Sequence, residues 1–168
     1  MKTIAAELRT AETSDAAALA ETHEAAWVNA YAGLIPHRAL RTMVGRRDEA
    51  WWRRAIARRA AILILDYAGE AVGYATVGRN RTPALPAEGE IFELYVRPEF
   101  QGLGFGRRLH SGAARLLAER GLKGRVVWAL ADNAPALRFY ENAGGVDVAE
   151  GCETFEGRTL RKIAFLWP

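Results

Sequence analysis

The 168-residue sequence contains a single cysteine, Cys152, so no disulfide can form within the chain. It has no apolar run that approaches the roughly 20 residues of a membrane-spanning helix. Its first residues acquire charge too soon for a secretory signal peptide. These absences exclude a disulfide-stapled scaffold and a helical membrane protein, and we expect a cytoplasmic location with no membrane partner.

An excess of charge of one sign is also missing, since 23 basic residues stand against 20 acidic ones, a net charge of +3. The small surplus of basic residues lies in residues 38–59, which contain many arginines and only two acidic residues, Asp48 and Glu49. A nucleic-acid platform would interleave such charge with aromatic rings, but Trp51 and Trp52 are adjacent. We interpret the segment as a solvated helix face with tryptophan anchors, and nucleic acid as an unlikely partner.

Histidine and cysteine at the spacing of metal ligands are absent as well. His23 lies in an apolar helical stripe, where a packed histidine is the commoner case. We therefore predict no metal site.

The periodicity of the chain predicts an α/β (α+β) fold in one domain, residues 1–168. Strands are expected over residues 4–9, 61–67, 71–78, 90–96, 125–130, 146–153 and 159–167. Helices are expected in the segment that ends at Gly33 and over residues 36–43 and 46–59. Two further helices are expected, one after the glycine turn at residues 102–106 and one after Asn133. Residues 79–89, with two prolines, predict an exposed loop that borders a cleft.

Three glycines, Gly102, Gly104 and Gly106, separate the strand at 90–96 from the next helix. Backbone without Cβ atoms can approach a ligand there, and a helix begins at the same point. Free N–H groups and the helix dipole then favour an anion, such as a phosphate or pyrophosphate. A dinucleotide site of Rossmann type would place this turn after the first strand, and a P-loop would end in Lys-Ser/Thr, so neither motif fits.

Two motifs resemble the GNAT superfamily of N-acetyltransferases. Residues 101–106, Gln-Gly-Leu-Gly-Phe-Gly, are similar to its Gln/Arg-x-x-Gly-x-Gly/Ala signature. Residues 133–144 are similar to its Asn-x-x-Ala-x-x-x-Tyr-x-x-x-Gly-Phe segment, with Gly145 in the place of the phenylalanine. Because that aromatic ring normally packs under the following strand, we expect looser packing there. The stretch from Tyr31 to Pro36 resembles a subgroup of small bacterial members.

The resemblance implies a mixed, mostly antiparallel sheet of six to seven strands, flanked by helices, whose parallel pair splays around the cofactor. The implied cofactor is acetyl-CoA as donor. The residues that the resemblance assigns to it are Leu94, Tyr95, Val96, Gln101, Gly102, Leu103, Gly104, Phe105, Gly106, Arg107, Asn133 and Tyr140.

The resemblance also implies acetyl transfer to a primary amine by direct attack, with Tyr140 as the acid that protonates the departing thiolate. For the base we rank Glu90 first and Glu93 second. Three residues apart on a regular strand, they face opposite sides, and only a bulge would bring both into one cleft. A salt-bridge role explains either glutamate equally well.

The acceptor is not encoded by these motifs. We expect a small-molecule amine, in a cleft built by the helices around residues 27–40 and the 79–89 loop, and the many arginines disfavour polyamines. The alternatives are acetylation of a protein N-terminus or an aminoacyl-tRNA, and a non-catalytic acyl-CoA-binding regulatory module. Edge strands near the C-terminus would permit a homodimer.

Overall fold

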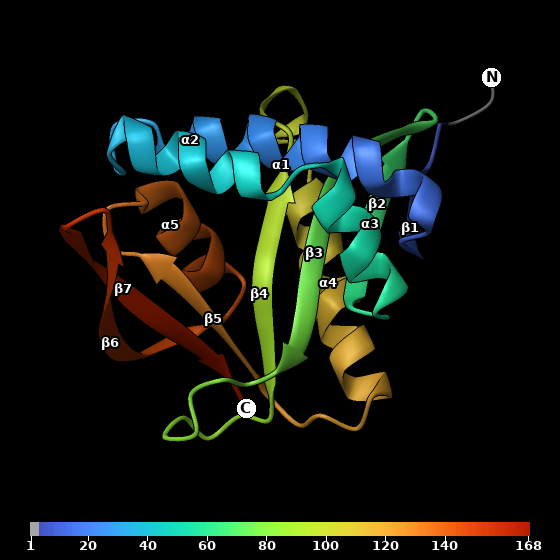
Figure 1. The fold of residues 1–168 in the computed structure, drawn as a ribbon. Helices are drawn as coiled ribbons and strands as arrows, with labels where there is room; N and C mark the ends of the chain where they lie inside the picture. The colour runs from blue at the N-terminus through green and yellow to red at the C-terminus, as the bar shows by residue number, and fades with distance from the viewer. Residues whose placement is uncertain (1–3) are drawn as a thin grey trace.

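Seven strands form one mixed sheet in the computed structural model, which describes residues 4–168 (Figure 1). In sheet order they are β1 (Ala6–Thr10), β2 (Ala61–Tyr67), β3 (Glu70–Arg79), β4 (Gly89–Val96), β5 (Arg125–Leu130), β7 (Arg158–Trp167) and β6 (Val146–Phe155). Within this range β4 and β5 are parallel and every other neighbouring pair is antiparallel. The mixed, mostly antiparallel sheet that the sequence predicts is confirmed.

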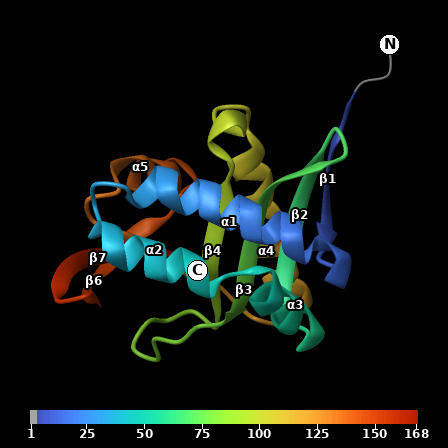
Figure 2. The ribbon, with the colours of Figure 1, turned by 45° about the horizontal axis from the view of Figure 1, so that its top comes forward.

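Helices cover both faces of the sheet (Figures 1 and 2). They are α1 (Ala16–Tyr31), α2 (His37–Arg46), α3 (Glu49–Ala57), α4 (Phe105–Glu119) and α5 (Ala134–Asn142), with short 3-10 turns η1 (Thr13–Asp15) and η2 (Pro98–Phe100). Successive side chains of β2 point to opposite faces of the sheet, so they belong to two different hydrophobic cores. Ile62 and Ile64 pack with α1 and α3, whereas Leu63 and Leu65 pack with α4. None of the helices within residues 4–168 is long and apolar enough to cross a membrane.

The arginine-rich segment folds as two helices with a break at Asp48. Asp48 caps α3, its carboxylate accepting a hydrogen bond from the Trp51 amide at 2.8 Å. The helix predicted from residue 46 therefore begins at Glu49. Trp52 is fully buried whereas Trp51 is half-buried, so Trp52 is the main anchor of this segment.

The parallel pair of β4 and β5 is very short. It is registered at two positions, Gly89 with Arg125 and Glu90 with Val126. Beyond Glu90 the two strands diverge, as Figure 1 shows, and the edge of β4 that faces β5 has no strand partner. Such backbone N–H and C=O groups require other partners. The opening between the strands therefore offers a ready place for an extended ligand.

Trp167 occupies the space beside Gly145. A Cβ atom on Gly145 would lie 2.6 Å from the Trp167 ring, and the indole N–H donates to the Ala143 carbonyl at 3.0 Å. The looser packing expected from the missing phenylalanine is wrong, because an aromatic ring from β7 fills this place.

Candidate active site

A cavity of about 780 Å³ lies where β4 diverges from β5. We call it the donor cleft. Its walls are the last turns of α1, the end of β4, the glycine turn and α5. It brings together ten of the twelve residues that the resemblance assigns to the cofactor: Leu94, Tyr95, Val96, Gln101, Gly102, Gly104, Gly106, Arg107, Asn133 and Tyr140.

Two of the assigned residues have side chains elsewhere. Leu103 is 61 % exposed and does not line the cleft. Phe105 is buried in the core, with its ring 5.2 Å from that of Tyr67. The side chains of these two residues therefore do not form part of the cleft wall.

The glycine turn needs glycine for two reasons, positive φ at Gly102 and Gly104 and close helix packing at Gly106. Gly102 and Gly104 have φ of 79° and 83°, the left-handed region that side chains with a Cβ rarely adopt. Gly104 is the N-cap of α4. Gly106 is helical, but a Cβ there would lie 3.0 Å from the Phe139 ring, so glycine lets α4 approach α5. Gly104, Gly106 and Arg107 at the start of α4 line the donor cleft, and a helix N-terminus suits an anion such as the pyrophosphate of a coenzyme A.

Asn133, directly before α5, and Tyr140 within α5 line the same cleft. Asn133 caps the helix, its side-chain oxygen accepting from the Ala136 amide at 3.4 Å. Tyr140 is 6 % exposed, and burial holds the pKa of its phenol well above the ordinary value. The phenol therefore keeps its proton at neutral pH and can act as an acid.

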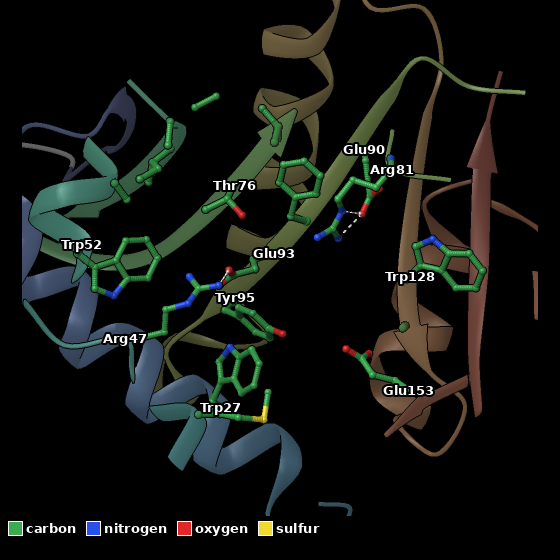
Figure 3. A pocket seen from close by; sticks show the side chains of 18 of the residues that line it. Trp27, Arg47, Trp52, Thr76, Arg81, Glu90, Glu93, Tyr95, Trp128 and Glu153 are labelled. Atoms are coloured by element: carbon green, nitrogen blue, oxygen red, sulfur yellow. Dashed lines mark hydrogen bonds and ion pairs between the residues drawn. The ribbon is translucent and has the colours of Figure 1, made fainter. Parts of the chain in front are cut away.

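A second cavity, of about 640 Å³, runs along β4 on the side of α1, α2 and α3 (Figure 3). We call it the acceptor cleft. Trp27, Tyr31 and Arg81 line it, so residues 27–40 and the 79–89 loop contribute to its wall as the sequence predicts. Tyr95 is the one residue among 4–168 that lines both clefts.

A β-bulge brings both candidate glutamates into the acceptor cleft. Thr76 of β3 pairs with Glu93, but the next residue, Val77, pairs with Ile91. Phe92 is therefore the extra residue, and the alternation of side chains shifts there by one. Glu90 and Glu93 both line the cleft, which the rule for a regular strand would forbid.

Each glutamate already has a cationic partner. Glu90, 1 % exposed, accepts from the Arg81 amide at 3.0 Å and from the Arg81 guanidinium at 2.6 Å. Glu93 accepts from the Tyr74 hydroxyl at 2.6 Å and forms a 2.7 Å ion pair with Arg47. Figure 3 shows these two pairs along one wall of the cleft. The sequence does not indicate the Arg47 contact, because Arg47 and Glu93 belong to distant segments. Arg81 lies only nine residues before Glu90, but no periodic pattern indicates that the loop between β3 and β4 folds back onto this glutamate.

Tyr31 and Tyr95 join where the two clefts meet. Their hydroxyl groups are hydrogen-bonded at 2.7 Å. Burial raises the pKa of Tyr31 to about 12, opposed by this hydrogen bond and aided by the charges of Glu93 and Glu153. The sequence places Tyr31 only within a family-like stretch and does not indicate this contact.

His23 packs behind Trp27, which lines the acceptor cleft. It is 1 % exposed, its ring lies 4.8 Å from that of Trp27, and neither ring nitrogen has a hydrogen-bond partner within residues 4–168. Burial, with a smaller effect of the Arg47 charge, lowers its pKa from 6.5 to about 3. It is a packed neutral histidine, and no three His, Cys, Asp or Glu side chains in the described range are grouped to hold a metal.

A mixed sheet that opens at one parallel pair, with a glycine turn at the opening, has the architecture of an N-acetyltransferase. The chain belongs to the acetyltransferase (GNAT) family, whose model matches residues 19–144.

Several relatives are similar in sequence. The chain is 27 % identical over 161 residues to YuaI of Bacillus subtilis, described as an uncharacterized N-acetyltransferase, covering 96 % of this chain and 92 % of that protein. It is 33 % identical over 127 residues to the mycothiol acetyltransferase of Streptomyces bingchenggensis, covering 72 % of this chain. The chain spans only 39 % of that enzyme's length.

Solved structures share the fold. The PaiA N-acetyltransferase of Thermoplasma acidophilum, in complex with coenzyme A, superposes with a TM-score of 0.74 at 16 % identity, over 94 % of this chain and 98 % of its own. YncA of Salmonella typhimurium, with acetyl-CoA, gives a TM-score of 0.71 at 21 % identity, over 99 % of this chain and 94 % of its own.

The buried His23 generates a prediction for stability. Between its folded pKa of about 3 and its ordinary value of 6.5, the unfolded chain binds a proton that the folded chain does not. The free energy of unfolding therefore falls as the pH is lowered, by about 2 kcal/mol from His23 alone between about pH 7 and about pH 5. Urea denaturation of the wild type and His23→Gln should show that this part of the slope disappears in the variant. The exposed His37 provides the control, since His37→Gln should keep the wild-type slope; an unchanged slope in His23→Gln would contradict the assignment.

Proposed function

We propose that the protein transfers the acetyl group of acetyl-CoA to a primary amine by direct attack. The observation that carries this proposal is the meeting of two clefts at Tyr95, one with a glycine turn and a protonated phenol, the other with carboxylates. An acetyl donor in the first cleft and an amine in the second would meet at this residue. Direct attack needs such an arrangement, because donor and acceptor must contact each other without an intermediate carrier.

In the donor cleft, the amides at the start of α4 would bind the pyrophosphate. The unpaired edge of β4 at Leu94–Val96 would hydrogen-bond the extended pantetheine arm as an added strand. The Val96 carbonyl already accepts from the Gln101 side chain at 3.1 Å, so Gln101 fixes the turn against the strand. Acetyl-CoA supplies a thioester carbonyl whose developing negative charge a β4 amide can stabilise.

Tyr140 is the proposed general acid. When the amine nitrogen bonds to the acetyl carbon and the carbon–sulfur bond breaks, the Tyr140 hydroxyl gives its proton to the thiolate. Its buried, protonated state and its position in the donor cleft support this role.

Glu93 is the proposed general base. It stands two residues before Tyr95, whereas Glu90 is farther from the meeting point and is held by both the backbone and side chain of Arg81. We therefore reverse the order that the sequence suggests. Glu93 would take the proton of the attacking amine, directly or through water. Glu90 anchors the connection between β3 and β4, residues 80–88, which we call the 80–88 loop.

A small-molecule amine is the acceptor that we favour. The acceptor cleft of about 640 Å³ lies within the range of small-molecule sites. A protein N-terminus or an aminoacyl-tRNA remains the alternative acceptor, and a non-catalytic acyl-CoA-binding module the alternative class. The presence of Tyr140 in one cleft and Glu93 in the other favours an enzyme over a binding module, because a binding module needs neither an acid nor a base.

Replacing Tyr140 tests the acid. Tyr140→Phe should lower kcat for acetylation by on the order of 10²-fold, because the thiolate must leave without a proton donor, while the Kd of acetyl-CoA changes little. The measurements are CoA release with a panel of amines and calorimetric binding of acetyl-CoA. Tyr67→Phe, which removes a phenol outside both clefts, should leave kcat unchanged. If kcat of Tyr140→Phe equals that of the wild type while chemistry limits turnover, Tyr140 is not the general acid.

Comparing the two glutamates tests the base. Glu93→Gln keeps a side chain that can accept from Tyr74 but cannot take a proton, so the acidic limb of the kcat/KM profile should disappear and the rate should fall on the order of 10²-fold. Glu90→Gln should retain that limb. The reverse pattern would assign the base to Glu90, and unchanged profiles in both would exclude either glutamate.

A further inference from the structure

The acceptor cleft is long. It follows β4 from Tyr95, where it meets the donor cleft, to Glu90. Five residues of a strand span about 16 Å. Figure 3 shows Trp27, Tyr95 and Glu153 toward one end and the Arg81–Glu90 pair at the other. An amine that reaches Tyr95 can therefore extend along the cleft toward the far end.

Little carboxylate charge in the cleft remains for a second ammonium group. The side chains of Glu90 and Glu93 are 2 % and 9 % exposed, and each is paired with an arginine at 2.6 Å and 2.7 Å. Breaking such a pair leaves a buried charge without compensation, which is costly. A polyamine would have to break one of them.

The remaining acid lies at the near end. Glu153 lines the cleft, forms no salt bridge within residues 4–168, and acts electrostatically on Tyr31. Tyr31 in turn contacts Tyr95 at the meeting point. The near end therefore suits the ammonium form of an arriving amine.

The far end is rimmed by cations. Arg59 follows α3, Arg120 follows α4, and both line the cleft with Arg81 of the 80–88 loop. The ends of these helices and the loop lie in the lower half of Figure 1, with the end of α3 higher than the other two. Neither Arg59 nor Arg120 has a salt-bridge partner in the described range. Guanidinium groups without a carboxylate partner suit an incoming carboxylate or phosphate.

Aromatic rings line the cleft between these ends. Phe92 of β4 and Trp128 of β5 line its walls, and each carries a cation over its ring, Arg81 at 4.4 Å and Lys162 at 4.7 Å. An apolar linking chain can pack against these rings and against the aliphatic stems of the two cations that cover them.

We propose that the acceptor is an elongated primary amine with an anionic group, a carboxylate or a phosphate, at the end remote from the amine. The amine binds near Glu153 and Tyr95, and the anionic group binds Arg59 and Arg120. This inference deepens the proposed function and rests on acetyl transfer at Tyr95.

Matched series of acceptors test this charge pattern. We would measure kcat/KM for ω-amino carboxylates and ω-aminoalkyl phosphates of increasing length, against n-alkylamines and α,ω-diamines of the same length. The anionic series should exceed the alkylamines by about tenfold or more, from charge-assisted hydrogen bonds, and the diamines should be the poorest. The better of the two anionic series identifies the group. A preference for diamines, or equal values for the anionic and neutral series, would overturn the proposal.

Charge reversal at the rim locates the anion site. Arg59→Glu and Arg120→Glu should each lower kcat/KM for the preferred anionic series by about tenfold and leave the alkylamines unchanged. The matched controls are Arg58→Glu and Arg115→Glu, exposed arginines outside the cleft with the same change in net charge. An equal loss in the control variants would mean that only overall charge matters and would contradict the site.

A binding measurement separates this inference from the proposed function. The tryptophans of the cleft allow the N-acetylated forms of an ω-amino carboxylate and of an alkylamine to be titrated by fluorescence, with no turnover required. The carboxylate should bind about tenfold more tightly, and Arg59→Glu should abolish the difference. If no amine is acetylated but this difference is present, acetyl transfer is wrong while the anion site stands. Equal Kd values would overturn the anion site itself.

Discussion

The divergence of β4 from β5 after two paired positions is the constraint on which the rest of the site depends. A parallel ladder that continued would close both the donor cleft and the route from it to the acceptor cleft. Because it stops at Glu90, the backbone of residues 91–96 faces the opening along one edge, and such groups favour a ligand that pairs like a strand. The same divergence lets Tyr95 face both cavities.

The packing around the opening keeps it in place. Gly106 allows α4 to contact Phe139 of α5, and Trp167 packs against Gly145 and hydrogen-bonds the Ala143 carbonyl. On the other side, Arg81 bonded to Glu90 ties the 80–88 loop to the start of β4, while Arg47 bonded to Glu93 ties α2 to its middle. The two ion pairs thus stabilise the wall of the acceptor cleft. The hydrogen-bonded ring of Trp167 stabilises the packing beside the donor cleft.

Much of this arrangement follows from local sequence. The runs at residues 61–67 and 125–130 are strands with the predicted bounds, because β-branched and apolar residues are continuous there and glycines or turns flank them. The glycine turn and Asn133 lie at the predicted helix starts, since capping and positive φ are local requirements. The motifs thereby predict most of the donor cleft.

The acceptor cleft follows less directly, for physical reasons. The bulge at Phe92 depends on how β4 is registered against β3, and alternation within β4 alone predicts one glutamate on each face. Arg47 reaches Glu93, and Tyr31 reaches Tyr95, across long stretches of chain that only tertiary packing brings together. A periodic pattern describes what a segment buries and carries no information about which distant charge it meets.

Hydrogen–deuterium exchange with and without coenzyme A will show whether the splayed strand and the glycine turn form the donor site. We predict slower exchange of the amides in residues 91–96 and 102–107 when coenzyme A binds, with residues 153–162 of the acceptor cleft unchanged. Slower exchange confined to the acceptor cleft, or binding that leaves both donor segments unchanged, would contradict it.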